Sequence, residues 1–337
     1  MNYRPRINCI IPNPSDSTSF WRASGVFSKL KYHIDCHYTF ETSISWSSLA
    51  WYDILFLQRP WGNSLYKACI IAKNNKTPIW IDFDDYLLDV PDYNPAKKFF
   101  GNKNDQNEML EMVKMATVVT VTTEKLKEKF LPFNPNVFIV PNAFNDYLFK
   151  WEYNFSKNKS INWRGSSSHR NDLHSLLESL IEIQRNPISD SFRWNFIGTD
   201  SELLKGFIKF KSHPVVDPVE YFYFIKELNP LVQLSPLVIH EFNEAKSNIA
   251  WIEATYSGAV TIAPKALKEF NRPGILLYDS IEEFKKILLS CMQINSEELK
   301  KFYDSSFDFI SSNLLLSKVN ELRKQIVIQL MDNRSKS

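Results

Sequence analysis

The segment from residue 240 to residue 264 holds the residues best suited to chemistry. It reads HEFNEAKSNIAWIEATYSGAVTIAP, a polar loop followed by a predicted helix and a buried strand. Lys246, Ser247 and Asn248 fall at the helix start, where a Ser or Asn side chain can cap and where free N–H groups attract an anion. Glu253, further along the helix, suits the vicinal hydroxyls of a ribose. The spacing predicts a nucleoside diphosphate site, against the plain alternative of a solvated lysine, a helix cap and an exposed glutamate.

The segment IWIDFDDYLLDVP places three carboxylates at the end of a predicted strand. Open α/β sheets bind ligands at the carboxyl ends of their strands, so Asp84 or Asp85 is predicted to orient an acceptor hydroxyl or to accept its proton. Capping of the following loop is the structural alternative. Asp82 and Asp84 also form an Asp-x-Asp pair, which suggests a divalent metal site as a competing interpretation. Because the stronger nucleotide signals lie about 160 residues later, we favour the hydroxyl-binding role and predict no metal.

A second cationic position follows another predicted strand, at residues 161–166. Arg164 ends this strand beside Gly165 and Ser166, and His169 comes shortly after. Two cations that flank a diphosphate would stabilise it as a leaving group without a metal. His169 suits either a ligand contact or the start of a helix, and Asp172 is expected to complement the helix dipole in the first turn.

Three further positions are weaker candidates. Ser235, next to Pro236, follows a buried strand where a nucleobase could pack, which is a fold-level analogy. Trp21 and Arg22 follow the loop after the first strand and are predicted to contact the acceptor. The alternatives are a contact with the donor phosphates for Arg22 and core packing for Trp21. The eight glycines include no Gly-x-Gly, which excludes a Walker loop and a dinucleotide fingerprint.

Short apolar runs alternate with amphipathic stretches along the whole chain, which predicts an α/β fold. The predicted strands of the first half are 7–12, 52–58, 77–83, 116–123 and 136–142. Helices are predicted from about residue 19 and over 63–75 and 103–116. In the second half the predicted strands are 161–166, 193–199, 215–217, 230–236, 259–264 and 274–278. Helices are predicted there over 169–186, 219–229, 246–258, 296–314 and 315–330.

The composition is that of an ordinary globular protein. The chain has 337 residues, 44% hydrophobic and 23% charged, with a formal net charge of +2. Neither half is strongly basic, which weighs against phosphate contacts to nucleic acid as the main source of binding energy. The four cysteines are far apart and are expected to be buried thiols. With no signal-peptide core and no long apolar window, we expect a soluble cytoplasmic protein.

Three segments together resemble retaining GT-B glycosyltransferases. They are VPN at 140–142, RGSSSHRNDL at 164–173, and KSNIAWIEATYSGAVTIAP at 246–264. The chain is most similar to short bacterial and bacteriophage enzymes of the glycosyltransferase group 1 type. The resemblance implies two Rossmann-like domains facing each other across a cleft. The implied boundaries are 1–145 for the acceptor domain, 146–160 for a linker, 161–310 for the donor domain, and 311–337 for a C-terminal helix that returns to the first domain.

The resemblance also implies roles for individual residues. Glu253 matches the second glutamate of a family motif, which holds the ribose. The first motif glutamate corresponds to Ala245 here, and the adjacent Glu244 or Asn243 is expected to take over its contact with the donor sugar. The predicted catalytic residues are Asp84, Asp85, Arg164 and Lys246. The predicted donor-binding residues are Glu253, Ser247, Asn248, Asn243, Glu244, Gly165, Ser166, His169 and Ser235.

The implied activity is metal-independent transfer of a hexose or pentose from a nucleoside-diphosphate sugar, with retention at the anomeric carbon. A UDP-sugar is the favoured co-substrate, and no permanently bound cofactor is expected. The expected acceptor is a surface glycan or a lipid-linked saccharide, reached without a transmembrane segment and by peripheral membrane association. A bacteriophage DNA-modifying enzyme acting on hydroxymethylcytosine is the first alternative. A non-catalytic nucleotide-sugar-binding protein is the second, because the first motif glutamate is missing.

Overall fold

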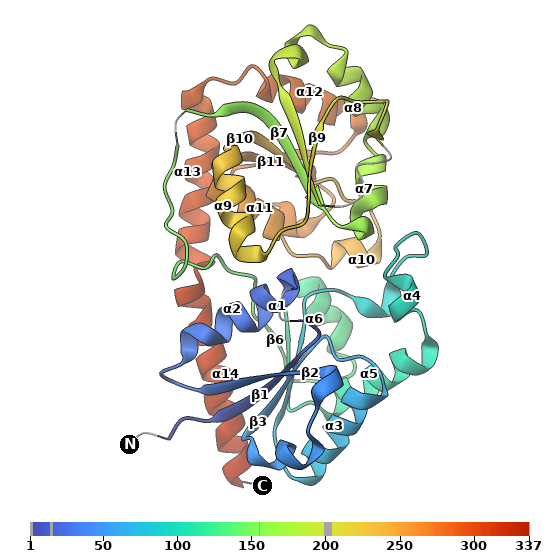
Figure 1. Cartoon of the computed structure of the whole chain (residues 1–337), viewed down its shortest axis with the longest axis vertical. Coiled ribbons are helices and arrows are strands. Elements are labelled where there is room, and N and C mark those ends of the chain that lie inside the picture. Colours follow the sequence, from blue (N-terminus) through green and yellow to red (C-terminus); the bar gives the residue numbers. More distant parts are fainter. Residues whose placement is uncertain (1–2, 14–15, 155, 199–203, 337) are drawn as a thin grey trace.

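The computed structural model describes residues 3–13, 16–154, 156–198 and 204–336. Residues 14–15 of the loop before Trp21 and Thr199 of the predicted strand 193–199 therefore lie outside the described residues. Figure 1 shows two α/β domains arranged along the long axis of the molecule, with the two C-terminal helices along one side. Within the described residues, each domain contains one six-stranded sheet.

The N-terminal sheet is parallel throughout, with the strand order β2-β1-β3-β4-β5-β6. Its strands are β1 (Arg6–Ile11), β2 (Asp35–Phe40), β3 (Ile54–Gln58), β4 (Ile79–Phe83), β5 (Val118–Val121) and β6 (Val137–Ile139). Five of these were predicted from buried apolar runs. The strand β2 was missed because it forms an edge of the sheet, so its residues are half-buried or exposed and form no apolar run.

Helices cover both faces of this sheet, which makes it Rossmann-like. They are α1 (Ser17–Arg22), α2 (Ser24–Phe27), α3 (Asn63–Asn74), α4 (Lys97–Phe100), α5 (Lys103–Met115) and α6 (Glu124–Phe130). The single helix predicted from residue 19 is in fact two, because the backbone leaves the helical region at Ala23 (φ −131°, ψ −82°). At this break a Cβ on Gly25 would lie 2.4 Å from the carbonyl oxygen of Phe20, so only glycine fits.

The C-terminal sheet is also parallel, with the order β12-β11-β10-β7-β8-β9. Its strands are β7 (Asn158–Gly165), β8 (Arg193–Gly198), β9 (Lys211–His213), β10 (Pro230–Leu234), β11 (Val260–Pro264) and β12 (Ile275–Tyr278). The strand predicted at 215–217 is wrong, and the strand lies earlier, at β9. Asp217 caps the next helix instead, accepting a hydrogen bond from the Val219 backbone N–H at 2.8 Å, with Pro218 at the first helical position.

The helices of the second half are α7 (Arg170–His174), α8 (Leu177–Gln184), α9 (Pro218–Leu228), α10 (Glu241–Glu244), α11 (Ile249–Ser257), α12 (Ile281–Cys291), α13 (Ser296–Asn313) and α14 (Leu316–Lys336). The helix predicted over 169–186 is divided into α7 and α8. The helix predicted from residue 246 begins at Ile249, so Lys246 and Ser247 lie in the turn that precedes it. Two Rossmann-like domains result, as predicted.

The last helix packs on the N-terminal domain, although the chain by then has completed the C-terminal sheet. Figure 1 shows α13 beside the C-terminal domain and α14 beside the N-terminal one. Leu316, Val319 and Leu330 of α14 are buried in one cluster with Ile7 and Cys9 of β1. No helix in the described part of the chain is long and apolar enough to cross a bilayer.

Candidate active site

A cavity of about 430 Å³ lies between the two domains, at the carboxyl ends of both sheets. The N-terminal domain contributes the start of α1 and the residues that follow β3, β4 and β6. The C-terminal domain contributes the ends of β7, β8 and β10 and the start of α11. Parallel strands therefore bring their carboxyl ends to a shared cleft, the place where open α/β sheets bind ligands.

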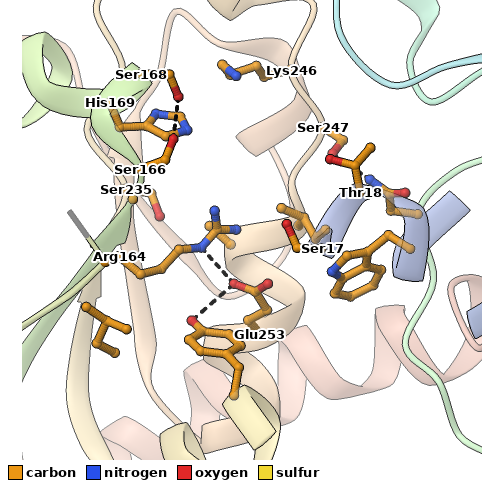
Figure 2. A pocket seen from close by; sticks show the side chains of 18 of the residues that line it. Ser17, Thr18, Arg164, Ser166, Ser168, His169, Ser235, Lys246, Ser247 and Glu253 are labelled. Atoms are coloured by element: carbon orange, nitrogen blue, oxygen red, sulfur yellow. Dashed lines mark hydrogen bonds and ion pairs between the residues drawn. The ribbon is translucent and has the colours of Figure 1, made fainter. Parts of the chain in front are cut away.

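The cavity collects most of the predicted site residues. Those that line it are Trp21, Asp84, Asp85, Arg164, Gly165, Ser166, His169, Ser235, Lys246, Ser247 and Glu253. Figure 2 shows Ser17 and Thr18 of α1 on the opposite side of the cavity from Arg164 and His169. Other lining residues were not predicted as site residues, among them Arg59, Asn142 and Tyr221. Arg59 and Asn142 follow apolar runs, and this position after a predicted strand was the sequence signal that could have identified them. No sequence signal pointed to Tyr221.

Arg164 and Glu253 form an ion pair at the base of the cavity. Arg164 Nε donates to Glu253 Oε2 at 2.8 Å, and the Tyr221 hydroxyl donates to the same oxygen at 3.3 Å. Glu253 is only 6% exposed, and this burial raises the pKa of its carboxyl group above the ordinary value, although Arg164 opposes the shift. The site thus holds a buried carboxylate with one oxygen already engaged.

Two buried polar atoms in the cavity wall have no hydrogen-bond partner among the described residues. They are Arg164 Nη2 and Ser235 Oγ. Gly198, with φ +110°, brings β8 so close to β7 that a Cβ there would lie 2.0 Å from the Gly165 carbonyl oxygen. Buried donors such as Arg164 Nη2 and Ser235 Oγ normally have a hydrogen-bond partner, so their presence in a cavity wall indicates a polar ligand with acceptor oxygens.

His169 is held by a buried carboxylate. Its Nδ1 lies 2.9 Å from Asp172 Oδ2, and burial lowers the pKa of the imidazole below its ordinary value. The other oxygen of Asp172 accepts hydrogen bonds from the Val238 backbone N–H at 2.8 Å and from Asn243 Nδ2 at 3.0 Å. The neutral ring then donates from Nδ1 and leaves Nε2 as an acceptor.

Opposite these groups, a four-residue cluster of charges joins the two domains. Arg59 donates to Asp84 through Nε and, at 2.7 Å, through Nη2, and it donates to Asp85 Oδ2 at 2.6 Å. Lys246 Nζ lies 3.3 Å from Asp85 Oδ1. Burial raises the pKa of Asp85, but Lys246 and Arg59 outweigh it and lower the pKa to about 2. Burial raises the pKa of Asp84 despite Arg59.

The Asp-x-Asp pair does not form a joint site. Asp82 is 3% exposed and binds Arg22 through both carboxylate oxygens, at 2.9 and 2.7 Å, whereas Asp84 binds Arg59. Their carboxylates are therefore engaged by different guanidinium groups. Among the described residues no group of three or more His, Cys, Asp or Glu side chains could hold a metal ion.

Four predicted site residues lie outside the cavity lining formed by the described residues. Arg22 is completely buried against Asp82, so it cannot touch an acceptor as predicted. Asn243 is engaged by Asp172, and Asn248 donates to the Glu269 carbonyl oxygen at 3.1 Å instead of capping α11. Glu244 faces the rim, where it forms an ion pair with Lys125 at 2.9 Å.

The structure also shows where Ala245 lies, the residue that the resemblance matched to the first motif glutamate. Ala245 is fully buried in the core cluster of the N-terminal domain, and its carbonyl oxygen accepts a hydrogen bond from Thr123 Oγ1 at 3.0 Å. Asn243 and Glu244, the residues expected to replace this glutamate, point elsewhere.

Trp21 lines the cavity but is 6% exposed and packs against Phe222 of α9, with ring centroids 5.8 Å apart.

Comparisons with known proteins identify the fold. No family model matches the sequence, and no curated protein matches it. Solved structures do match. Anabaena Alr3699/HepE in complex with UDP-glucose is 12% identical, with 97% of this chain and 100% of that chain covered and a TM-score of 0.63.

Two further structures broaden the comparison. An alpha-glucosyltransferase in complex with UDP-glucose and DNA containing an abasic site is 11% identical, with 96% and 99% coverage and a TM-score of 0.64. A putative UDP-N-acetylglucosamine 2-epimerase from Listeria monocytogenes is 12% identical, with 90% and 91% coverage and a TM-score of 0.57. The predicted resemblance is confirmed at the level of the fold: the chain has the GT-B architecture, with two Rossmann-like domains that face each other across a cleft.

Proposed function

We propose that the protein is a glycosyltransferase that moves a sugar from a UDP-sugar to a hydroxyl group, with retention at the anomeric carbon. The observation that carries this proposal is the meeting of Arg164, Lys246 and the buried Glu253 in one interdomain cavity. Cations at a cleft suit a diphosphate, and a buried carboxylate suits ribose hydroxyls. The structural neighbours crystallised with UDP or UDP-glucose support the choice of donor.

Within this proposal, the donor lies against the C-terminal domain. The second carboxylate oxygen of Glu253 accepts hydrogen bonds from the ribose hydroxyls. The phosphates accept hydrogen bonds from Arg164 Nη2, Ser235 and Ser247. Lys246, in the turn before α11, also donates to the diphosphate, at the place where its Nζ lies 3.3 Å from Asp85 of the N-terminal domain. These donors stabilise the charge that develops on the departing UDP, which is the largest electrostatic demand of the reaction.

The acceptor hydroxyl lies beside Asp84 and Asp85 in this proposal. Asp85 has a pKa of about 2 and is bound by two cations, so it is a poor proton acceptor at neutral pH. Asp84, whose pKa is raised by burial, is the better candidate to orient the hydroxyl. The departing diphosphate, which is close to the reacting carbon, takes the proton. No protein nucleophile is required.

We propose a surface glycan or lipid-linked saccharide as the acceptor, in the cytoplasm, with peripheral membrane association where the acceptor is lipid-linked. A hydroxymethylated base in phage DNA is the second candidate, favoured by the structural neighbour solved with UDP-glucose and DNA. The net charge of +2 favours the glycan. We propose the boundaries 1–145, 146–160 and 161–310, supported by the interval between Ile139, which ends β6, and Asn158, which begins β7. The segment 311–337 contains the returning helix α14, which begins at Leu316, after α13 ends at Asn313.

Donor binding is tested by thermal unfolding with UDP, other nucleoside diphosphates and their sugars, with magnesium or with a chelator. A ligand at one hundred times its Kd should stabilise the wild type by about 2.7 kcal/mol. We expect stabilisation by UDP without magnesium and its loss in Glu253→Ala and Lys246→Ala. Stabilisation by no nucleotide would contradict the proposal.

Turnover is tested by following UDP release from UDP-glucose with and without acceptors. Binding without any release, with glycans or with hydroxymethylated DNA, would favour a non-catalytic nucleotide-sugar-binding protein. Release that requires hydroxymethylated duplex DNA, and falls as salt rises, would favour the DNA-modifying alternative.

A further inference from the structure

A chain of hydrogen bonds runs from the core of the N-terminal domain to the loop of the C-terminal domain that carries Lys246 and Ser247. Arg22, beneath the cavity, donates to Asp82 through Nε and Nη2. Its Nη1 donates to the Val140 carbonyl oxygen at 2.8 Å and to Asn142 Oδ1 at 3.2 Å. Asn142 Nδ2 then donates to Ser247 Oγ at 2.8 Å, across the domain boundary. Asn142 and Ser247 both line the cavity.

The direction of each bond in this chain follows from chemistry. A guanidinium group can only donate, so the side-chain oxygen of Asn142 must face Arg22 and its NH₂ group must face Ser247. The arrangement is firm because Arg22 is fully buried, and Thr120 Oγ1 donates to the same Asp82 at 2.6 Å. The orientation of the amide is thus set by a buried ion pair.

The Ser247 hydroxyl has one proton. Since its oxygen accepts a hydrogen bond from Asn142, that proton is left to donate to another group. Ser247 is next to Lys246 in the turn before α11, with its side chain at the cavity. Phosphate oxygens only accept hydrogen bonds, so a hydroxyl with this polarity is preset for an anionic ligand.

We propose that Asn142 is a positioning residue, oriented by Arg22, that fixes the Ser247 hydroxyl as a hydrogen-bond donor to the donor diphosphate. This inference rests on the proposed function. It also gives Arg22 a role that differs from the predicted contact with the acceptor, since Arg22 acts through Asn142 and touches no substrate.

Asn142→Asp is the sharpest test, because the substitution is nearly isosteric. A carboxylate at this position accepts from Arg22 and from the Ser247 hydroxyl, which turns the proton away from the cavity. It also adds a negative charge near the diphosphate. A double-mutant cycle with Ser247→Ala separates the two effects, because the charge acts in both backgrounds and the hydroxyl in only one.

We would measure the Kd for UDP by calorimetry in the wild type, Asn142→Asp, Ser247→Ala and the double variant. We expect Ser247→Ala to weaken UDP binding about tenfold, as for a hydrogen bond to a charged group. The penalty of Asn142→Asp should be at least fivefold smaller in the Ser247→Ala background. Uridine, which has no phosphate, should bind all four proteins alike.

Equal penalties in both backgrounds would overturn the inference while the proposed function stands. Failure of the wild type to bind UDP would overturn the proposed function and this inference with it. Asn142→Ala, which removes the donor without adding charge, is the second variant should Asn142→Asp unfold. It should weaken UDP binding in the Ser247 background and have no effect in the Ser247→Ala background, and an equal effect in both would likewise overturn the inference.

Discussion

At the scale of single residues, the cavity is built from ion pairs that cross between strands or domains. Arg164 holds Glu253 within the C-terminal domain, and Lys246 reaches Asp85 of the N-terminal domain. Arg59 completes the cluster from the end of β3, in a left-handed conformation with φ +48° that is uncommon for a residue with a side chain. Charged groups at these depths require partners, and the pairs therefore hold the side chains in place.

The raised pKa of Glu253 predicts how UDP affinity changes with pH. In the proposed function the ionised carboxylate accepts hydrogen bonds from the ribose hydroxyls, so UDP affinity is highest above the folded-state pKa of Glu253 and falls as pH decreases through that value. Because burial raises the pKa, the loss begins at a higher pH than the ordinary 4.5 implies. Glu253→Gln should bind UDP about tenfold more weakly at pH 7.5 and lack this component.

The measurement is a titration of UDP affinity against pH for the wild type and for Glu253→Gln. Protonation of UDP itself affects both proteins, so the ratio of their affinities isolates the carboxyl group. Glu220→Gln, at an exposed position on α9, is the matched control and should follow the wild type. A ratio independent of pH would show that Glu253 does not bind the donor in its ionised form.

At the scale of elements, the segment from β10 to α11 joins the domains. Its short helix α10 is held at the rim by Glu241, which lies 2.6 Å from Lys129 of α6, and by the pair between Glu244 and Lys125. Behind this rim Ala245 is buried in the opposite domain. The loop that carries Lys246 is thus fixed from the N-terminal side, and the cleft depends on this contact.

Placing a glutamate at residue 245 should therefore destabilise the protein. Ala245→Glu places a carboxylate in an apolar cluster, where an uncompensated charge costs about 3–5 kcal/mol. We expect a lower free energy of unfolding and weaker UDP binding, measured by chemical denaturation and calorimetry. Glu244→Ala, which removes only a rim ion pair, should change stability by less than about 1 kcal/mol. Wild-type stability with tighter UDP binding in Ala245→Glu would contradict this.

At the scale of the whole molecule, the chain crosses between the domains more than once. Phe144 pairs with Leu315 through an isolated bridge, and α14 then covers one face of the N-terminal sheet. The N-terminal domain is therefore completed by the last residues of the chain. Its core, and with it one wall of the cavity, depends on a segment that is far away in sequence.

Leu330→Ala tests this dependence. Leu330 has no exposed surface, so its truncation should lower the free energy of unfolding by about 2–5 kcal/mol through lost burial and a residual cavity. Ile328 lies on the same helix with 61% of its surface exposed, and Ile328→Ala should cost less than about 0.5 kcal/mol. Urea denaturation measures both. Equal effects would mean that α14 does not pack on the N-terminal domain in solution.

The sequence by itself determined the α/β class, ten of the twelve strands in the described part of the chain, and many of the residues that line the cavity. Buried parallel strands appear as apolar runs, and the chemistry lies where those runs end, so Arg164, Ser235 and Asp84 could be placed before any contact was known. The helix that follows Lys246 likewise shows its start and end locally. These are short-range signals.

Only the tertiary structure decided which polar residues face the cavity and which form hydrogen bonds or ion pairs with one another. Arg22 and Asp82 are separated by 60 residues, and Asn142 and Ser247 by 105, so neither pairing leaves a local pattern. Ala245 is buried by a domain that precedes it by more than a hundred residues. A strand end can be predicted from hydrophobicity, but the direction of its polar side chains depends on the partner that the fold brings to it.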